Sequence, residues 1–255
     1  MALDDSYSKA LLHFDGADAS TTFTDESGKT WSAAGNAQID TAQSVFGGAS
    51  LLLDGVNDYI DTPYSTDWYL DDGNNTHNWT IDFRVNLADT NKGGICSRIY
   101  SSTGFWSIHM TTDWLYFISM NGTVKHNLYK SFGGSINTWY HVAIVKDGTT
   151  YRFFKDGTSL GTSTSTDVLA DWGSGTMKIG QGRDDTTAYS LNGHIDEFRL
   201  SKGIARWTSD FTVPTSPYGG GGPAGIKKIL GVASASIKKT SGVVYAGVKK
   251  ISGVS

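Results

Sequence analysis

The sequence predicts an all-β fold, an antiparallel β-sandwich followed by a small C-terminal β-repeat segment, and three observations support this. Apolar and polar residues alternate over short runs such as 79–85 (WTIDFRV), which is the period of a strand with one buried face. Asp-Gly pairs at 147–148 and 156–157 separate such runs, and this pair is typical of hairpin turns. The 31 glycines, 8 tryptophans, 12 tyrosines and 11 phenylalanines suit turns and aromatic-rich strands.

The expected strands follow one another along the chain. They cover 10–15, 50–53, 59–61, 79–85, 94–99, 104–110, 114–119, 141–145, 150–154, 159–162 and 194–200. Asp25 begins a DESG turn, because an Asp side chain accepts hydrogen bonds from backbone N–H groups two residues further on. In the strand over 79–85, Asp82 and Arg84 are expected to face water.

The strand expected over 194–200 places one acid among apolar side chains. Strict alternation puts four residues on one face: His194, Asp196, Phe198 and Leu200. It puts three on the other: Ile195, Glu197 and Arg199. An inward carboxylate must be ion-paired, bonded to backbone N–H groups or bound to a metal, since an unpaired buried charge is costly. We therefore expect Asp196 to hold another group in place.

These residues also resemble a known family. The motif G-x-I-D-E-F-R-L at 193–200, followed by a short helical turn ending at Trp207 and then F-x-x-P, is similar to the end of laminin-G-like modules. The runs 51–60, 79–85, 137–145 and 151–161 match the order of that family's core strands. The resemblance covers about 9–218 and implies a concanavalin A-like jelly roll over residues 1–218. That fold hosts lectins, glycosidases and structural modules, so it does not decide the function.

The C-terminal part of the chain has a different composition. A glycine-rich linker at 219–225 precedes 226–255, which contains six lysines and no acid, whereas the chain before it carries 15 Lys and Arg against all 25 Asp and Glu. An 11-residue repeat (226–232, 237–243, 248–254) predicts three short strands folded at 230–231, 241–242 and 252–253. Strands this short need partners. The apolar positions expected to mediate assembly are Ile226, Val232, Ile237, Val243, Val248 and Val254.

This arrangement of a laminin-G-like module and I-K-K-x-x-G-V repeats resembles structural proteins of tailed bacteriophages. The resemblance implies a virion protein of the head or the tail fibres, assembled in the bacterial cytoplasm, whose partners are itself, with a trimer favoured, and other virion proteins. Residues 1–9 contain two acids and no apolar stretch, so no signal peptide is expected. No apolar run approaches a membrane span, and we expect no membrane partner.

Catalysis is not expected. Glucanases of this fold place their carboxylates on one strand in an E-x-D-x-x-E pattern, whereas the nearest pair here is Asp196 and Glu197, predicted on opposite faces of a strand. The six histidines and Cys96 show no zinc spacing. Lysines in the tail alternate with β-branched residues, which favours contact with an acidic protein surface over nucleic acid.

The sequence suggests two candidate binding sites, and each has a structural alternative. Calcium is the cofactor that the family resemblance implies, with Asp15, Asp18, Asp25 and Asp196 as its candidate ligands. The alternative is that these aspartates cap turns and form ion pairs. For glycan binding, five aromatic residues in expected loops are candidates: Tyr64, Trp68, Tyr69, Trp172 and Tyr189. The alternative is that these rings close the ends of the sandwich.

The leading interpretation is a non-enzymatic virion protein that displays a lectin-like domain for host-surface glycans. A free bacterial carbohydrate-binding lectin module is the alternative, and a degenerate glycosidase is the third interpretation. The three differ in what they require of the molecule: multimers through 226–255, sugar binding through loop aromatics, or a carboxylate at Glu197 that supports turnover.

Overall fold

The computed structural model describes residues 6–171, 173–183, 189–219, 228–229 and 232–233. The chain divides into two compact units. The first is Tyr7–Val213, and the second contains Pro214–Ser255 together with Met1–Ser6. Of the candidate residues, Trp172, Ile226, Ile237, Val243, Val248 and Val254 lie outside the described residues.

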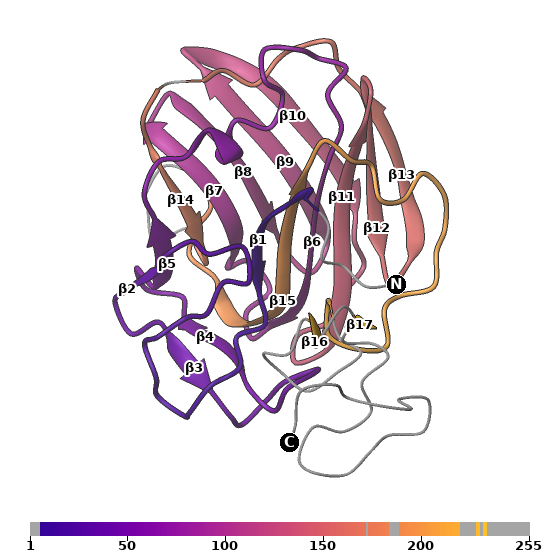
Figure 1. Ribbon diagram of the computed structural model, residues 1–255. Coiled ribbons are helices and arrows are strands. Elements are labelled where there is room, and N and C mark those ends of the chain that lie inside the picture. The colour runs from indigo at the N-terminus through magenta and orange to yellow at the C-terminus, as the bar shows by residue number, and fades with distance from the viewer. Residues whose placement is uncertain (1–5, 172, 184–188, 220–227, 230–231, 234–255) are drawn as a thin grey trace. The chain divides into compact units, whose positions relative to one another are not determined.

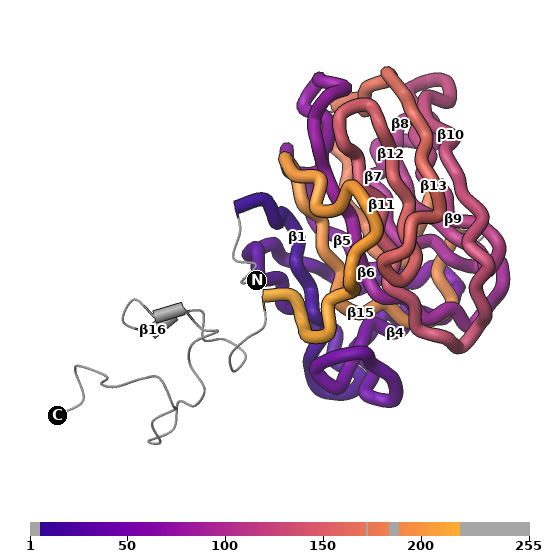
Figure 2. The backbone as a smooth tube through the Cα atoms, turned by 90° about the vertical axis from the view of Figure 1, so that its right-hand side faces the viewer, coloured from indigo at the N-terminus to yellow at the C-terminus, as the bar shows by residue number. Residues whose placement is uncertain are grey.

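The unit Tyr7–Val213 is a sandwich of two antiparallel sheets, which confirms the predicted fold class (Figure 1). Sheet A runs in the order β13 (Thr158–Thr164), β12 (Thr150–Lys155), β11 (Trp139–Asp147), β6 (Trp79–Leu87), β15 (Asn192–Lys202), β4 (Ser50–Asp54) and β3 (Gln38–Asp40), and β1 (Ser8–Leu12) also pairs with β15. Sheet B runs in the order β10 (Thr123–Ser131), β9 (Trp114–Asn121), β8 (Gly104–Met110), β7 (Gly93–Ser101), β14 (Thr176–Ile179), β5 (Tyr59–Thr62) and β2 (Ser32–Ala34). A 3₁₀ turn, η1 (Thr66–Trp68), lies in the loop before β6. The tube in Figure 2, turned by 90°, shows β9 and β10 on one side of β11, β12 and β13.

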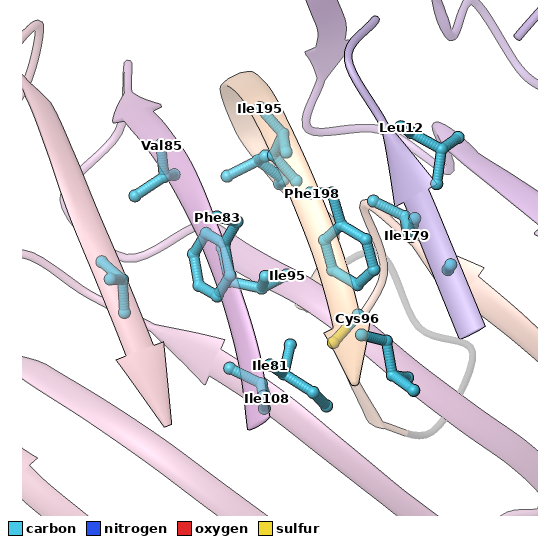
Figure 3. Close-up of a cluster of buried hydrophobic side chains, with 14 of the residues drawn as sticks. Leu12, Ile81, Phe83, Val85, Ile95, Cys96, Ile108, Ile179, Ile195 and Phe198 are labelled. Carbon is cyan, nitrogen blue, oxygen red and sulfur yellow. The ribbon is translucent and has the colours of Figure 1, made fainter. Parts of the chain in front are cut away.

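The core lies between the inner faces of the two sheets. Phe83 of β6 stacks on Phe198 of β15, with ring centroids 6.4 Å apart. Figure 3 shows these rings beside Ile95 and Ile108, which come from sheet B. Burying each large apolar side chain contributes about 1.5–3 kcal/mol, so this interior supplies much of the driving force for folding.

Strand β15 departs from the alternation that its sequence predicts. Asp196 pairs with Arg84 of β6, but the next pairing joins Arg199 to Asp82, so β15 contains one extra residue. Glu197 has a φ of 52° at this point, which fits a β-bulge. Ile195, Phe198 and Leu200 consequently share the core, and the prediction that Asp196 lies on the same face as Phe198 and Leu200 is wrong.

The outer face of sheet A is covered rather than exposed to water. Residues 203–211 form an irregular segment in which Trp207 stacks on Phe211 at 4.0 Å, and both rings pack against β11 and β12. The predicted helical turn at 204–207 is therefore not formed. Asp82 is fully buried instead of facing water. Its carboxylate accepts two hydrogen bonds from Arg199, at 3.0 and 2.9 Å.

The turn predictions are largely confirmed. Asp147 ends β11 and pairs with Thr150, so Gly148 and Thr149 form the turn to β12, one residue later than predicted, whereas Asp156–Gly157 joins β12 to β13 as predicted. Asp156 and Gly157 both have positive φ, at 48° and 76°, as a tight hairpin turn requires. The strands β2, β3, β10 and β14 were not predicted, although Asn121–Gly122 before β10 is itself a hairpin sequence.

In the second unit, β16 (Lys228–Ile229) pairs antiparallel with β17 (Val232–Ala233). This pairing agrees with the first chain reversal that the 11-residue repeat predicts. Val232, one of the expected assembly positions, lies in β17. Among the described residues, no helix has both the length and the apolar character needed to cross a membrane.

The buried Arg199–Asp82 pair leads to a test of the covered outer face. Replacing Arg199 with Leu leaves the Asp82 carboxylate buried without its main partner, so the free energy of unfolding should fall by about 3–5 kcal/mol. Urea denaturation measures this loss. The double variant Asp82→Asn/Arg199→Leu should recover most of it, and a single variant as stable as the wild type would contradict the buried geometry.

Candidate functional site

Five aromatic side chains form a continuous series on the outer face of sheet B, and we call them the aromatic row: Trp114, Tyr129, Tyr116, His109 and Tyr189. Successive ring centroids in this order are 5.4, 5.7, 4.5 and 5.5 Å apart. These distances fall in the range of favourable aromatic pairs. Trp114 is 39 % exposed and Tyr129 is 48 % exposed, so the row begins at the surface near the sheet's edge strand β10.

Strand register places three of these rings in line. His109 of β8 pairs with Tyr116 of β9, and Tyr116 pairs with Tyr129 of β10. Directly opposite residues on antiparallel strands project from the same face, so their rings meet across the strands. The inner face carries the alternating residues, such as Leu115 and Phe117, which belong to the core. These three rings therefore form a line perpendicular to the strands, and Trp114 lies beside it on β9.

A glycine lets Tyr189 extend the row beyond β8. Gly94 of β7 pairs with His109, and a Cβ atom at Gly94 would lie 1.6 Å from the carbonyl oxygen of Tyr189. Gly182 donates its N–H to the same carbonyl at 2.8 Å. Without a side chain at position 94, the backbone of Tyr189 reaches the sheet, and its ring contacts His109.

The row is uncharged near neutral pH except at one end. Burial and the nearby Arg183 charge lower the pKa of His109 to about 4, so its imidazole is neutral. Burial raises the pKa of Tyr116, helped by Tyr129 and Asp113, so its phenol keeps its proton. Arg183 lies over the Tyr189 ring at 4.8 Å and supplies the charge at that end.

The structure separates the aromatic residues nominated from the sequence. Tyr189 belongs to the row, whereas Tyr64 and Tyr69 lie in the loop before β6, where Tyr64 donates to Asp171 at 3.3 Å. Trp68 is fully buried and donates to the Pro63 carbonyl, so the prediction that it stacks on sugars is wrong. Trp68 instead closes one end of the core against Trp31.

Four members of the row were missed: Trp114, Tyr129, Tyr116 and His109. Trp114 and Tyr116 are two residues apart in a predicted strand, and this spacing places both on one face. This period-two spacing of two aromatic residues was the available signal. The strand that carries Tyr129 was not predicted, so the register that completes the row was not accessible.

The comparisons with known proteins agree with this architecture. The sequence profile of the laminin G type 3 family, described as the concanavalin A-like lectin/glucanases superfamily, matches residues 54–206. The chain belongs to this superfamily. No curated protein matches it in sequence.

Solved structures with this fold include binding domains from several bacteria. Domain 4 of AbnA, an extracellular GH43 arabinanase from Geobacillus stearothermophilus in complex with arabinotriose, is 14 % identical, with a TM-score of 0.56 over 78 % of this chain and 94 % of that one. The binding domain of Paraclostridial Mosquitocidal Protein 1 is 14 % identical, with a TM-score of 0.56 over 78 % and 49 %. The receptor binding domain of the botulinum neurotoxin C/D mosaic serotype is 15 % identical, with a TM-score of 0.56 over 78 % and 49 %. The match thus spans about half of each toxin chain, and at these identities it shows the fold alone.

In this member of the superfamily, the two neighbouring carboxylates of β15 form structural contacts. The Asp196 Oδ2 atom accepts from the backbone N–H groups of Val45 and Phe46 at 2.7 and 3.0 Å. This confirms that Asp196 holds another segment in place. Glu197 contacts His13 at 2.8 Å. Both carboxylates are buried, and an arrangement that flanks a glycosidic bond is not formed by them.

The four predicted calcium ligands do not gather in one place. Both Asp25 oxygens are used by protein donors, the N–H groups of Leu11 and Ser27 and the Trp31 indole. Asp18 accepts from Thr41 at the surface. Among the described residues, no three His, Cys, Asp or Glu side chains are arranged to hold a metal ion. Calcium binding stays a prediction.

Asp15 and Asp196 do lie close enough to affect one another. Burial raises the pKa of Asp196 to about 7, and the charges of Glu197 and Asp15 add to this, although the Phe46 and Val45 hydrogen bonds oppose it. The second oxygen of Asp196, Oδ1, is buried without a hydrogen-bond partner among the described residues. Burial also raises the pKa of Asp15.

This raised pKa gives the stability a defined pH dependence. Because the folded carboxyl binds its proton more tightly than the unfolded one, its contribution is full below about pH 4 and is lost as the pH rises to about 7. Asp196→Asn keeps an acceptor for Val45 and Phe46 but does not ionise. Relative to this variant, the wild type should lose about 2 kcal/mol of unfolding free energy between pH 5 and pH 7.

Urea denaturation of both proteins at the two pH values measures the difference. Asp15 titrates in both proteins, so its contribution largely cancels. A difference between wild type and variant that does not change with pH would contradict the raised pKa.

Proposed function

We propose that the sandwich is a non-catalytic carbohydrate-binding domain, displayed on a phage virion, whose aromatic row binds glycans of the host surface. The observation that supports this is the exposure of Trp114 and Tyr129 beside each other on a sheet face. Isolated exposed apolar residues are ordinary, but adjacent ones mark interaction surfaces.

The chemistry of the row suits a sugar. An aromatic ring offers an apolar face to the C–H side of a sugar ring, while tyrosine hydroxyls offer hydrogen bonds to its polar rim. Rigid aromatic side chains also lose little conformational freedom on binding. The half-buried Tyr116 lies beside Tyr129 and stacks on the buried His109, and these contacts keep the rings in place.

The comparisons support this proposal at the level of the fold. The description of the superfamily names lectins and glucanases. One solved domain of this fold, from an arabinanase, was determined in complex with arabinotriose. Two others are named as binding domains of toxins. Within β15 of this chain, the neighbouring carboxylates serve structural contacts, which favours binding over hydrolysis.

Replacing Trp114 with Ala should weaken glycan binding roughly tenfold or more, since it removes the row's one indole, which is 39 % exposed. An array of bacterial surface glycans, read with the labelled full chain, measures this. Tyr100→Ala is the matched control, because Tyr100 is 54 % exposed and its ring is not one of the rings that meet in the row. Equal binding by wild type and Trp114→Ala would overturn the proposed site.

For the C-terminal segment, we propose an assembly role in the virion. The support is the 11-residue repeat together with the β16–β17 pairing, which agrees with the strands that the repeat predicts. Short strand pairs of this size are not stable alone and gain stability by pairing with further strands. Six lysines without an acid also suit an acidic protein partner.

Removing this segment should change the oligomeric state. Light scattering after size exclusion should show an oligomer, with a trimer favoured, for the full chain and a monomer for a chain ending at Tyr218. Two monomers would contradict the assembly role and favour the free lectin module.

A further inference from the structure

We infer that the aromatic row binds several consecutive units of one uncharged glycan chain, which lies across strands β8 to β10, rather than a single terminal sugar. This inference rests on the proposed function and specifies its ligand. It commits to one class of occupant, a neutral polysaccharide or long oligosaccharide whose inner units are recognised.

The row is an extended surface that crosses several strands of sheet B. Its members come from three adjacent strands and from the segment that passes over Gly94. Adjacent strands are about 4.8 Å apart, so Tyr129, Tyr116 and His109 advance by one strand at a time, whereas Trp114 lies beside them on β9, two residues before Tyr116. The row therefore extends well beyond the width of one sugar ring, and Trp114 and Tyr189 at its two ends are separated by three intervening rings.

The rings of the row differ in how much of their surface is accessible to a ligand. His109 and Tyr116 stack on one another with an interplanar angle of 12°, so the faces that meet are used, and because His109 is buried the half-buried Tyr116 is the accessible ring of this pair. Trp114 and Tyr129 meet at 80°, which leaves ring surface exposed at that end. One end thus suits the apolar face of a sugar unit, and the phenol hydroxyls further along suit the hydroxyl groups of the next units.

Charge complementarity favours a neutral chain. The neutral His109 and the protonated Tyr116 carry no charge at the centre of the row. A buried or half-buried surface without charge would leave the carboxylates of a polyuronate partly desolvated and unpaired there. Arg183 lies only at the Tyr189 end, so it does not provide repeated cationic sites along the chain.

The test measures affinity as a function of chain length. Isothermal titration of the full chain would use linear arabinan, xylan and dextran, their oligosaccharides of one to six units, and alginate as a charged chain. For the neutral polymer that binds best, affinity should rise roughly tenfold or more between one unit and four. Alginate should bind more weakly than that polymer.

Variants at the two ends of the row separate the alternatives. With oligosaccharides of four or more units, both Trp114→Ala and Tyr189→Phe should weaken binding, whereas with one or two units at most one of them should. Tyr189→Phe removes only the hydroxyl and keeps the ring. Tyr100→Ala should have no effect at any length, and circular dichroism checks that each variant is folded.

The outcomes distinguish the inference from the proposed function on which it rests. Binding that is already complete with a single unit, or stronger binding of alginate, overturns the extended neutral chain but leaves a lectin. Equal length dependence in the wild type and Tyr189→Phe also overturns it. A folded protein that binds none of these carbohydrates, and none on the array of bacterial glycans, overturns both.

Discussion

The extra residue at Glu197 determines how β15 is oriented, and β15 lies at the centre of sheet A between β6 and β4. Because a strand alternates its faces with a period of two, one inserted residue moves every later side chain to the opposite face. Phe198 and Leu200 thereby enter the core, and Arg199 reaches Asp82 outside it. On that outer face the Arg199 guanidinium also lies over the Trp207 ring, 5.7 Å from its centroid.

Sheet B is ordered by a simpler rule, direct pairing without a shift at the residues of the row. His109, Tyr116 and Tyr129 are aligned because β8, β9 and β10 keep one register there. Sheet A uses its outer face for an additional layer of its own chain, whereas sheet B presents aromatic side chains on its outer face. The two outer faces of the sandwich therefore differ: one is covered by the chain itself, and the other carries exposed rings.

Local patterns in the sequence were sufficient for the fold class, the hairpins and the role of Asp196 as an acceptor. The alternation of apolar and polar residues and the Asp-Gly pairs are patterns of a few residues. They are sufficient to locate strands such as β6 and β12. The bulge at Glu197 could not be read in this way, because it is stabilised by neighbours such as His13 that are distant in sequence. The aromatic row depends on the register of three strands, one of which was not predicted. Trp68 is fully buried although its neighbours in the loop are polar, so the local sequence does not indicate its burial.

A residue without a side chain defines how far the candidate surface extends. Gly94 makes room for the backbone of Tyr189, and any larger residue there would displace that carbonyl from the sheet. The length of the row is thus encoded at a position that presents no side chain to a ligand. Engineering of this domain toward shorter or longer ligands would begin at such spacer positions, where volume rather than chemistry decides which rings belong to the surface.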